Sequence, residues 1–163
     1  MLDFSRVVAL RQRRLDRMLK AENAEKVALS GARDALSAAQ KAIDDYLEET
    51  RTLEIDLLTE LLHRGVSVND LLAVEETLKK TKQKARELAD RRAECEALLD
   101  AAKERARIAE RNRLQSARKL DKSEHIQSHI QALRHQAELF REEAAIDEFC
   151  EQVAVRGSRG DGA

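Results

Sequence analysis

The chain has 163 residues, of which 37% are charged and 2% aromatic, and it contains no proline. This composition is typical of long helices and coiled coils, because so few aromatic side chains cannot build the core of an ordinary globular domain. The 30 basic and 31 acidic side chains leave a net charge of −1, so no overall basic excess favours binding to nucleic acid.

A first long helix is predicted from about residue 2 to residue 62. Apolar residues recur there at spacings of three and four, which is the pattern of a coiled-coil seam. The seam residues are Phe4, Val8, Leu15, Met18, Leu29, Ala32, Leu36, Ala39, Ile43, Tyr46, Leu53 and Leu57. Polar residues interrupt the seam at Arg11, Glu22, Glu25 and Thr50, and Gly31 lies inside the helix. We therefore expect a narrow interface with one partner helix.

Large aliphatic residues crowd the last turns of this predicted helix. They are Leu53, Ile55, Leu57, Leu58, Leu61 and Leu62. One interpretation is tighter packing where a hairpin closes. The other is a partly exposed apolar patch that binds a partner.

The helical pattern breaks between residues 62 and 71. Gly65 is expected to end the first helix, because glycine adopts the left-handed conformation at little cost. Ser67 with Asp70 three residues later resembles a capping box at the start of a second helix. A turn over residues 63–69 would make the two helices antiparallel neighbours. The alternative is one uninterrupted helix with a kink at this point.

The second helix is predicted from residue 70 to about residue 153. Its seam is rich in alanine, which lets two helices approach closely but buries little apolar area. The seam residues are Leu71, Val74, Leu78, Ala85, Leu88, Cys95, Leu99, Ala102, Ala106 and Ala109. The seam fades over residues 111–123 and resumes, shifted by one residue, from Ile126, which predicts a local change in winding. A glycine-rich, flexible and disordered tail is predicted over residues 155–163.

The two predicted helices differ in length. Reversal at Gly65 places Asp3 beside residues 126–130, so the segment Leu133–Glu151 lacks an intramolecular partner. Its apolar stripe, formed by Leu133, Ala137, Phe140, Ala144 and Phe149, indicates a surface that binds another protein. The alternatives are pairing with a second copy and folding back. Residues 1–30 carry a net charge of +3 and residues 138–151 one of −5, which would orient a partner.

The chain lacks the motifs of common catalytic and cofactor sites, including phosphate-binding loops and zinc-ligand spacings. We therefore expect no enzyme and no catalytic, cofactor-binding or metal-binding residues. His125 and His129 could form half of a metal site, but a solvated helix face is favoured. The same holds for the basic cluster over residues 79–86, whose alternative is RNA binding. Without a signal peptide or membrane span at the start, a cytoplasmic protein with reduced cysteines is expected.

Several short segments together carry a resemblance to a known family. They are Val7-Val8-Ala9-Leu10-Arg11-x-Arg13-Arg14, Val66-Ser67-Val68-Asn69-Asp70-Leu71, a Lys/Glu-rich second helix, and Glu142-Glu143-x-x-x-Asp147-Glu148-Phe149. With this architecture the chain resembles the YscO-type central stalk proteins of bacterial type III secretion, relatives of the flagellar export protein FliJ.

The resemblance implies an all-α fold, a long antiparallel two-helix coiled-coil hairpin similar to the shaft of the rotary ATPase gamma subunit. It implies a cytoplasmic virulence-associated protein, peripheral to the inner-membrane secretion apparatus. Such a stalk binds and stimulates the hexameric secretion ATPase, contacts the cytoplasmic ring of the export gate, and engages some secretion chaperones. It implies no nucleic-acid partner and no insertion into the membrane.

Two partner surfaces are hypothesised on this basis. The surface for the ATPase consists of Arg11, Arg13, Arg14, Arg17, Phe140, Arg141 and Phe149. The surface for the export gate consists of Leu58, Leu62, Val66, Val68 and Leu72. The alternative functions are a self-associating structural coiled coil and an escort for secretion chaperones.

Overall fold

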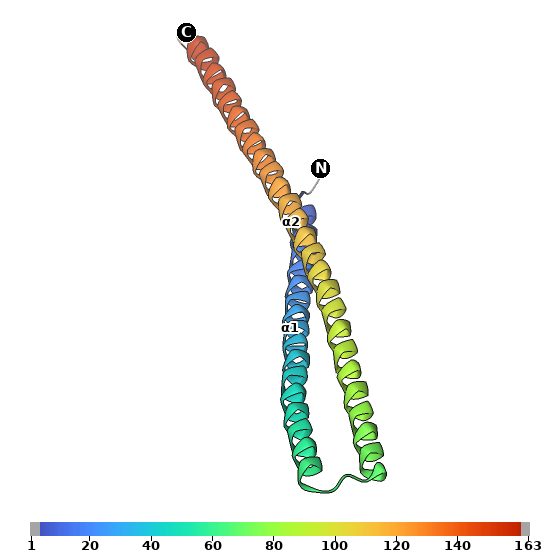
Figure 1. The fold of residues 1–163 in the computed structure, drawn as a ribbon. Coiled ribbons are helices and arrows are strands. Elements are labelled where there is room, and N and C mark those ends of the chain that lie inside the picture. The colour runs from blue at the N-terminus through green and yellow to red at the C-terminus, as the bar shows by residue number, and fades with distance from the viewer. Residues whose placement is uncertain (1–3, 161–163) are drawn as a thin grey trace. The chain divides into compact units, whose positions relative to one another are not determined.

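The protein folds into two long helices in the computed structural model, which describes residues 4–160, with side chains described through residue 154. Helix α1 spans Phe4–His63 and helix α2 spans Val68–Gly160 (Figure 1). The two helices run antiparallel and contact each other, and the described residues include no strand. This confirms the predicted all-α two-helix hairpin and excludes a single kinked helix.

The contacts divide the chain into two units. The terminal unit comprises Met1–Arg17 with Leu114–Ala163, and the loop unit comprises Met18–Arg113. Each unit therefore contains a part of both helices, and the loop unit also holds the connection between them.

The loop, residues 64–67, is closed on its α2 side by the predicted capping box. The backbone N–H of Asp70 donates to Ser67 Oγ at 3.2 Å, and the backbone N–H of Ser67 donates to Asp70 Oδ2 at 3.0 Å. Hydrogen bonds from Ser67 lower the pKa of the Asp70 carboxyl below its usual value of 3.8. Ser67 is thus the N-cap, and α2 begins at Val68, two residues earlier than predicted.

The left-handed conformation predicted for Gly65 is wrong. None of the glycines in the described part of the chain has a positive φ, so Gly65 does not adopt the left-handed form. Helix α1 ends before it, at His63, and the N–H of Arg64 still donates to the carbonyl of Glu60 at 3.2 Å. The reversal therefore depends on the Ser67–Asp70 cap rather than on a left-handed glycine.

The interface in the loop unit follows the predicted seams. Most seam residues are only half-buried, because two helices alone cover a large side chain incompletely; the small residues Ala39 and Ala102 are buried. Tyr46 adds a specific contact, since its hydroxyl donates to the carbonyl of Thr81 at 3.2 Å. Lys84 Nζ lies 5.0 Å from the centre of the Tyr46 ring, within cation–π range. Small residues and one tyrosine therefore hold the middle of this hairpin together.

Helix α2 continues to Gly160, which is seven residues beyond the predicted end at Val153. Adding residues to an established helix costs little, and no proline interrupts this segment. The glycines near the end cost only about 1 kcal/mol each relative to alanine. Of the predicted tail, residues 155–160 have a helical backbone, and residues 161–163 lie outside the described residues.

Candidate protein-binding surfaces

Arg11 anchors the start of α1 on α2 within the terminal unit. Its Nη1 donates to the carbonyl of Lys119 at 2.6 Å and to the hydroxyl of Ser123. Ser123 is fully buried, and its hydroxyl donates to the carbonyl of Lys119 at 2.9 Å. The guanidinium of half-buried Arg11 is therefore engaged in hydrogen bonds to α2, which sets it apart from the other arginines hypothesised to bind a partner.

The α2 seam runs without interruption through the region where it was predicted to fade and shift. After Ala109, buried or half-buried positions recur at spacings of three and four, with Ala117 half-buried in addition beside Ser116: Arg113, Ser116, Leu120, Ser123, Gln127 and Ile130. Ile126, the predicted restart, is 37% exposed. The prediction is wrong because it followed apolar residues, whereas this stretch of the interface is largely polar.

Glu22 lies at the centre of the polar part of the loop unit and is 3% exposed. Lys26 Nζ lies 2.7 Å from Glu22 Oε1, and Arg113 Nε lies 2.5 Å from Oε2 as an ion pair without hydrogen-bond alignment. The hydrogen bond from Lys26 is the main cause that lowers the pKa of Glu22 below its usual 4.5, and Arg113 adds to it against the opposing effect of burial.

Glu25 and Thr50, the other polar seam residues, are also satisfied. Glu25 Oε2 lies 3.3 Å from Arg105 Nε across the interface, and Thr50 Oγ1 donates to the carbonyl of Tyr46 at 2.8 Å. Three of the four polar interruptions in α1 therefore meet polar atoms of α2. Such matched pairs favour one register of the two helices over others, as buried polar groups do in coiled coils.

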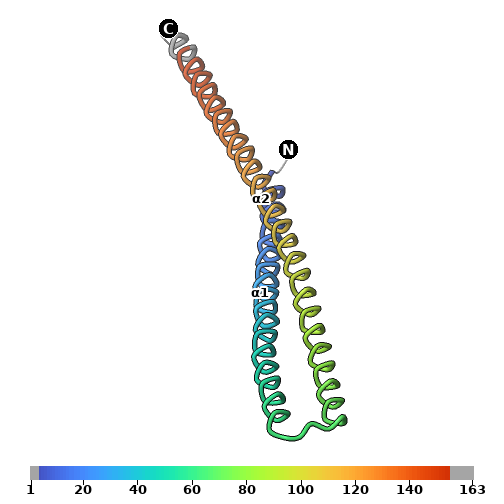
Figure 2. Tube along the Cα trace, viewed as in Figure 1, coloured from blue at the N-terminus to red at the C-terminus, as the bar shows by residue number. Residues whose placement is uncertain are grey.

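The segment of α2 over residues 131–154, called here the extension, has no partner. Every residue in it is exposed. Figures 1 and 2 show α2 running past the start of α1 with no other segment beside it. Its exposed large apolar residues are Leu133, Leu139, Phe140, Ile146, Phe149 and Val153. The predicted lack of an intramolecular partner is confirmed, and the described part of α2 does not fold back.

The extension carries two apolar stripes rather than the predicted single one. Phe140 and Phe149 are nine residues apart, which is about two and a half helical turns, so they lie on opposite sides of α2. The first stripe consists of Leu133, Ala137, Phe140 and Ala144, and the second of Leu139, Ile146, Phe149 and Val153. The prediction that Phe149 belongs to the first stripe is therefore wrong.

The exposed arginines of α1 lie apart from the aromatic residues of the extension. Arg13, Arg14 and Arg17 are exposed, and Arg17 Nε donates to the carbonyl of Arg13 at 3.4 Å. Arg11 fixes this part of α1 beside Ser123, and Phe140 lies 17 residues further along α2, roughly 25 Å away. The residues hypothesised to bind the ATPase therefore form two patches in the terminal unit, with Arg141 on the extension.

The loop end of the loop unit presents a third surface. The residues hypothesised to bind the export gate are all exposed: Leu58, Leu62, Val66, Val68 and Leu72. Leu62 is 85% exposed, so the crowded leucines do not pack more tightly where the hairpin closes. The interpretation as an exposed apolar patch is the one that the structure supports.

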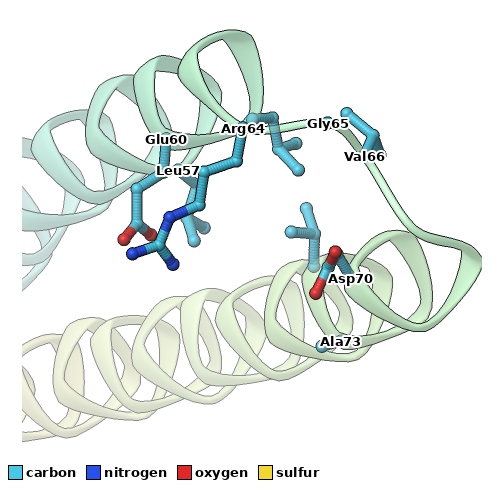
Figure 3. A pocket seen from close by; sticks show the side chains of 9 residues that line it. Leu57, Glu60, Arg64, Gly65, Val66, Asp70 and Ala73 are labelled. Atoms are coloured by element: carbon cyan, nitrogen blue, oxygen red, sulfur yellow. The ribbon is translucent and has the colours of Figure 1, made fainter.

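A pocket of about 270 Å³ separates the two helices beside this patch. Figure 3 shows Leu57 and Glu60 of α1 and Arg64 of the loop reaching toward α2, with Asp70 across from them. The helices are thus not in close contact at the loop. Apolar surface remains accessible on both sides of the reversal.

None of the helices in the described part of the chain has an apolar stretch long enough to cross a membrane. Comparison of the chain with models of protein families, with curated proteins and with solved structures finds no match.

Proposed function

We propose that the protein is a non-enzymatic central stalk of a type III secretion export apparatus, which links and stimulates the hexameric secretion ATPase and contacts the export gate. The observation that carries this proposal is a two-helix hairpin that leaves apolar side chains exposed at its loop and along the α2 extension. Exposed apolar clusters of this kind mark surfaces that bind other proteins. Two such surfaces on one narrow hairpin suit a protein that connects two partners.

The dimensions of a helix pair support the role of a stalk. Each helix is about 10–12 Å across, so the paired region is narrow enough to enter the central opening of a protein ring. A two-helix shaft lacks the six-fold symmetry of a hexamer and meets its subunits unequally. Unequal contacts favour different conformations in different subunits, which is a physical route to stimulating ATP hydrolysis.

The extension and the start of α1 are proposed to bind the ATPase. The contacts assigned to it are the exposed arginines Arg13, Arg14 and Arg17, together with Phe140, Arg141 and Phe149 on the extension. Arg11 is assigned the internal role of holding α1 in place for this contact. The loop patch, defined above, is assigned to the cytoplasmic ring of the export gate, and some secretion chaperones are further proposed partners.

Charge reversal of the exposed arginines tests this assignment. A variant with Arg13, Arg14 and Arg17 changed to Glu is mixed with the secretion ATPase from the same cells, and ATP hydrolysis is measured against stalk concentration. We expect the concentration for half-maximal stimulation to rise at least about tenfold, because charge pairs at an interface are commonly worth more than 1 kcal/mol.

A matched variant controls for the change in net charge. It reverses three exposed basic residues of the loop unit, Lys82, Arg86 and Arg91. We expect it to stimulate ATP hydrolysis like the unchanged protein, and circular dichroism should show unchanged helix content in both variants. Equal stimulation by all three proteins would remove the α1 arginines from the ATPase contact.

Self-association is the second candidate function, favoured by the uncovered extension. A structural coiled coil would use residues 131–154 to form a dimer or tetramer. Light scattering of the purified protein separates the two, since a stalk is expected to be monomeric at micromolar concentration. A third candidate, an escort for secretion chaperones, would bind a chaperone without affecting ATP hydrolysis.

A further inference from the structure

The extension exposes apolar side chains on two opposite sides of one helix. Phe140 is 61% exposed on the first stripe, and Phe149 is 66% exposed on the second. A helix that lies in a surface groove buries only one apolar stripe and leaves the opposite side in water. A groove would therefore cover half of the apolar surface that this extension presents.

The charge of the extension indicates the chemistry of what surrounds it. Residues 138–151 contain six acidic side chains and one basic one, Arg141. The acidic residues are Glu138, Glu142, Glu143, Asp147, Glu148 and Glu151. A protein surface that covers this segment must supply positive charge, because unpaired carboxylates at an interface are costly to desolvate.

Neither the extension nor the basic start of α1 in a second copy of the chain supplies this combination. Two extensions packed together would bring two strongly acidic segments into contact. The basic start of α1 has suitable charge, but its exposed large apolar residues are Leu10, Leu19 and Val27. Leu10 and Leu19 are nine residues apart and lie on opposite sides of α1, so they form no continuous stripe.

We infer that the extension inserts into a socket on one partner protein, with two facing apolar walls and rims of lysine or arginine. Phe140 packs against the first wall, and Phe149 packs against the second. The inference rests on the proposed function for the identity of that partner, the secretion ATPase. The chemistry of the socket follows from the extension itself.

Photo-crosslinking from both stripes tests the inference in the full chain. A photoreactive phenylalanine analogue replaces Phe140 in one protein and Phe149 in another, and each is illuminated with the secretion ATPase. We expect both positions to crosslink to the ATPase, at two different segments that each contain lysine or arginine. Controls carry the same analogue at Gln136 and Gln152, exposed positions between the stripes, where crosslinking should be weaker.

Alanine substitution gives an independent readout. Phe140→Ala and Phe149→Ala should each weaken binding to the ATPase at least about tenfold, because truncating a central aromatic anchor commonly has an effect of this size. Gln136→Ala should leave binding unchanged. The substitutions should not alter helix content, since both phenylalanines are exposed in the free protein.

The outcomes separate this inference from the proposed function. If only one phenylalanine crosslinks or affects affinity, the extension lies in a groove and the socket is wrong. Crosslinks between copies of the chain, or to acidic segments of the ATPase, would also overturn it. If the ATPase stimulation depends on the arginines while neither phenylalanine crosslinks, the function stands and the socket fails.

A lack of any binding to the ATPase would instead overturn the proposed function. Crosslinking with the same two photoreactive proteins, expressed in the cells that naturally contain the chain, then tests the socket. Crosslinks from both positions to two basic segments of one protein would support the socket only if that protein, once identified and purified, also binds Phe140→Ala and Phe149→Ala at least about tenfold more weakly. Crosslinks to different proteins, or from one position only, would refute it.

Discussion

At the scale of single residues, the polar side chains in the seam carry the most information. Glu22 interrupts an apolar pattern, yet it is nearly fully buried and ion-paired with Arg113 of α2. The sequence indicated that Glu22 and Arg11 lie on the seam, but their partners were missed, because the α2 pattern was followed through apolar residues alone. The register expected from the loop, with Asp3 beside residues 126–130, places Arg11 and Glu22 a few residues short of Ser123 and Arg113, so the loop alone would not have paired them.

Glu22→Gln tests the ion pair and should make the protein less stable at neutral pH, because Arg113 and Lys26 lose their negative partner. The pKa of Glu22 is lowered in the folded protein, so its contribution to stability is fully present above its usual pKa of 4.5. That contribution is lost as the pH falls through the lowered folded value. The difference in Tm between the unchanged protein and the variant should therefore shrink as the pH falls below 4.5.

Thermal unfolding at pH 7 and pH 3, followed by circular dichroism, measures this difference. The control is Glu75→Gln, which removes a carboxylate paired with Lys79 on the surface of α2. Its effect on Tm at pH 7 should be smaller, because exposed pairs within one helix contribute little. A Glu22→Gln variant with the same loss at both pH values would show that the charge of Glu22 does not stabilise the hairpin.

At the scale of the helices, the sequence predicted the existence and relative direction of α1 and α2 better than the residues at which they end. Heptad spacing and a short loop sufficed for two antiparallel helices, and the Ser67–Asp70 pair sufficed for the start of α2. The conformation of Gly65 could not be predicted, because α1 ends before Gly65 and the cap of α2 makes the reversal. The end of α2 was placed too early, because glycine weakens a helix without stopping it.

Gly31→Ala should stabilise α1. Gly31 lies in the interior of the helix and is exposed, and a methyl group added there would meet no atom within 4 Å. Alanine loses less backbone entropy than glycine on forming a helix, so the free energy of unfolding should rise by about 1 kcal/mol. Chemical denaturation at pH 7 measures this change.

Gly65→Ala is the matched control for this prediction. An added methyl group at Gly65 also meets no atom within 4 Å, and Gly65 has no positive φ. Because Gly65 lies in the loop, alanine gains no helix propensity there, and the free energy of unfolding should change by less than about 0.5 kcal/mol. A destabilised Gly31→Ala variant would mean that α1 packs against a surface absent from the isolated chain.

At the scale of the whole molecule, the sequence predicted that α2 extends beyond α1. It did not predict how the apolar residues are arranged on that extension. The unequal helix lengths follow from the position of the loop, and the extension is uncovered as expected. The division of its apolar residues between two sides was missed, because a single seam was drawn through both phenylalanines. The identity of the partner could not be predicted from one sequence, since it depends on the chemistry of another protein.

Removal of the extension should separate stability from binding. The extension contributes no contact that buries its own side chains, so a chain ending at Ile130 should keep its Tm within about 3 °C, as expected for a change below 1 kcal/mol. The same chain should fail to bind the secretion ATPase, because both apolar stripes are gone. Calorimetry measures the first expectation and co-sedimentation with the ATPase the second.

The full-length chain with both Phe140→Ala and Phe149→Ala is the matched control, since it keeps the length of α2 but loses both anchors. It should share the unchanged Tm and the loss of binding. A truncated chain that unfolds at a much lower temperature would show that residues after Ile130 stabilise the hairpin. Retained binding by that chain would move the ATPase contact to the exposed arginines of α1 alone.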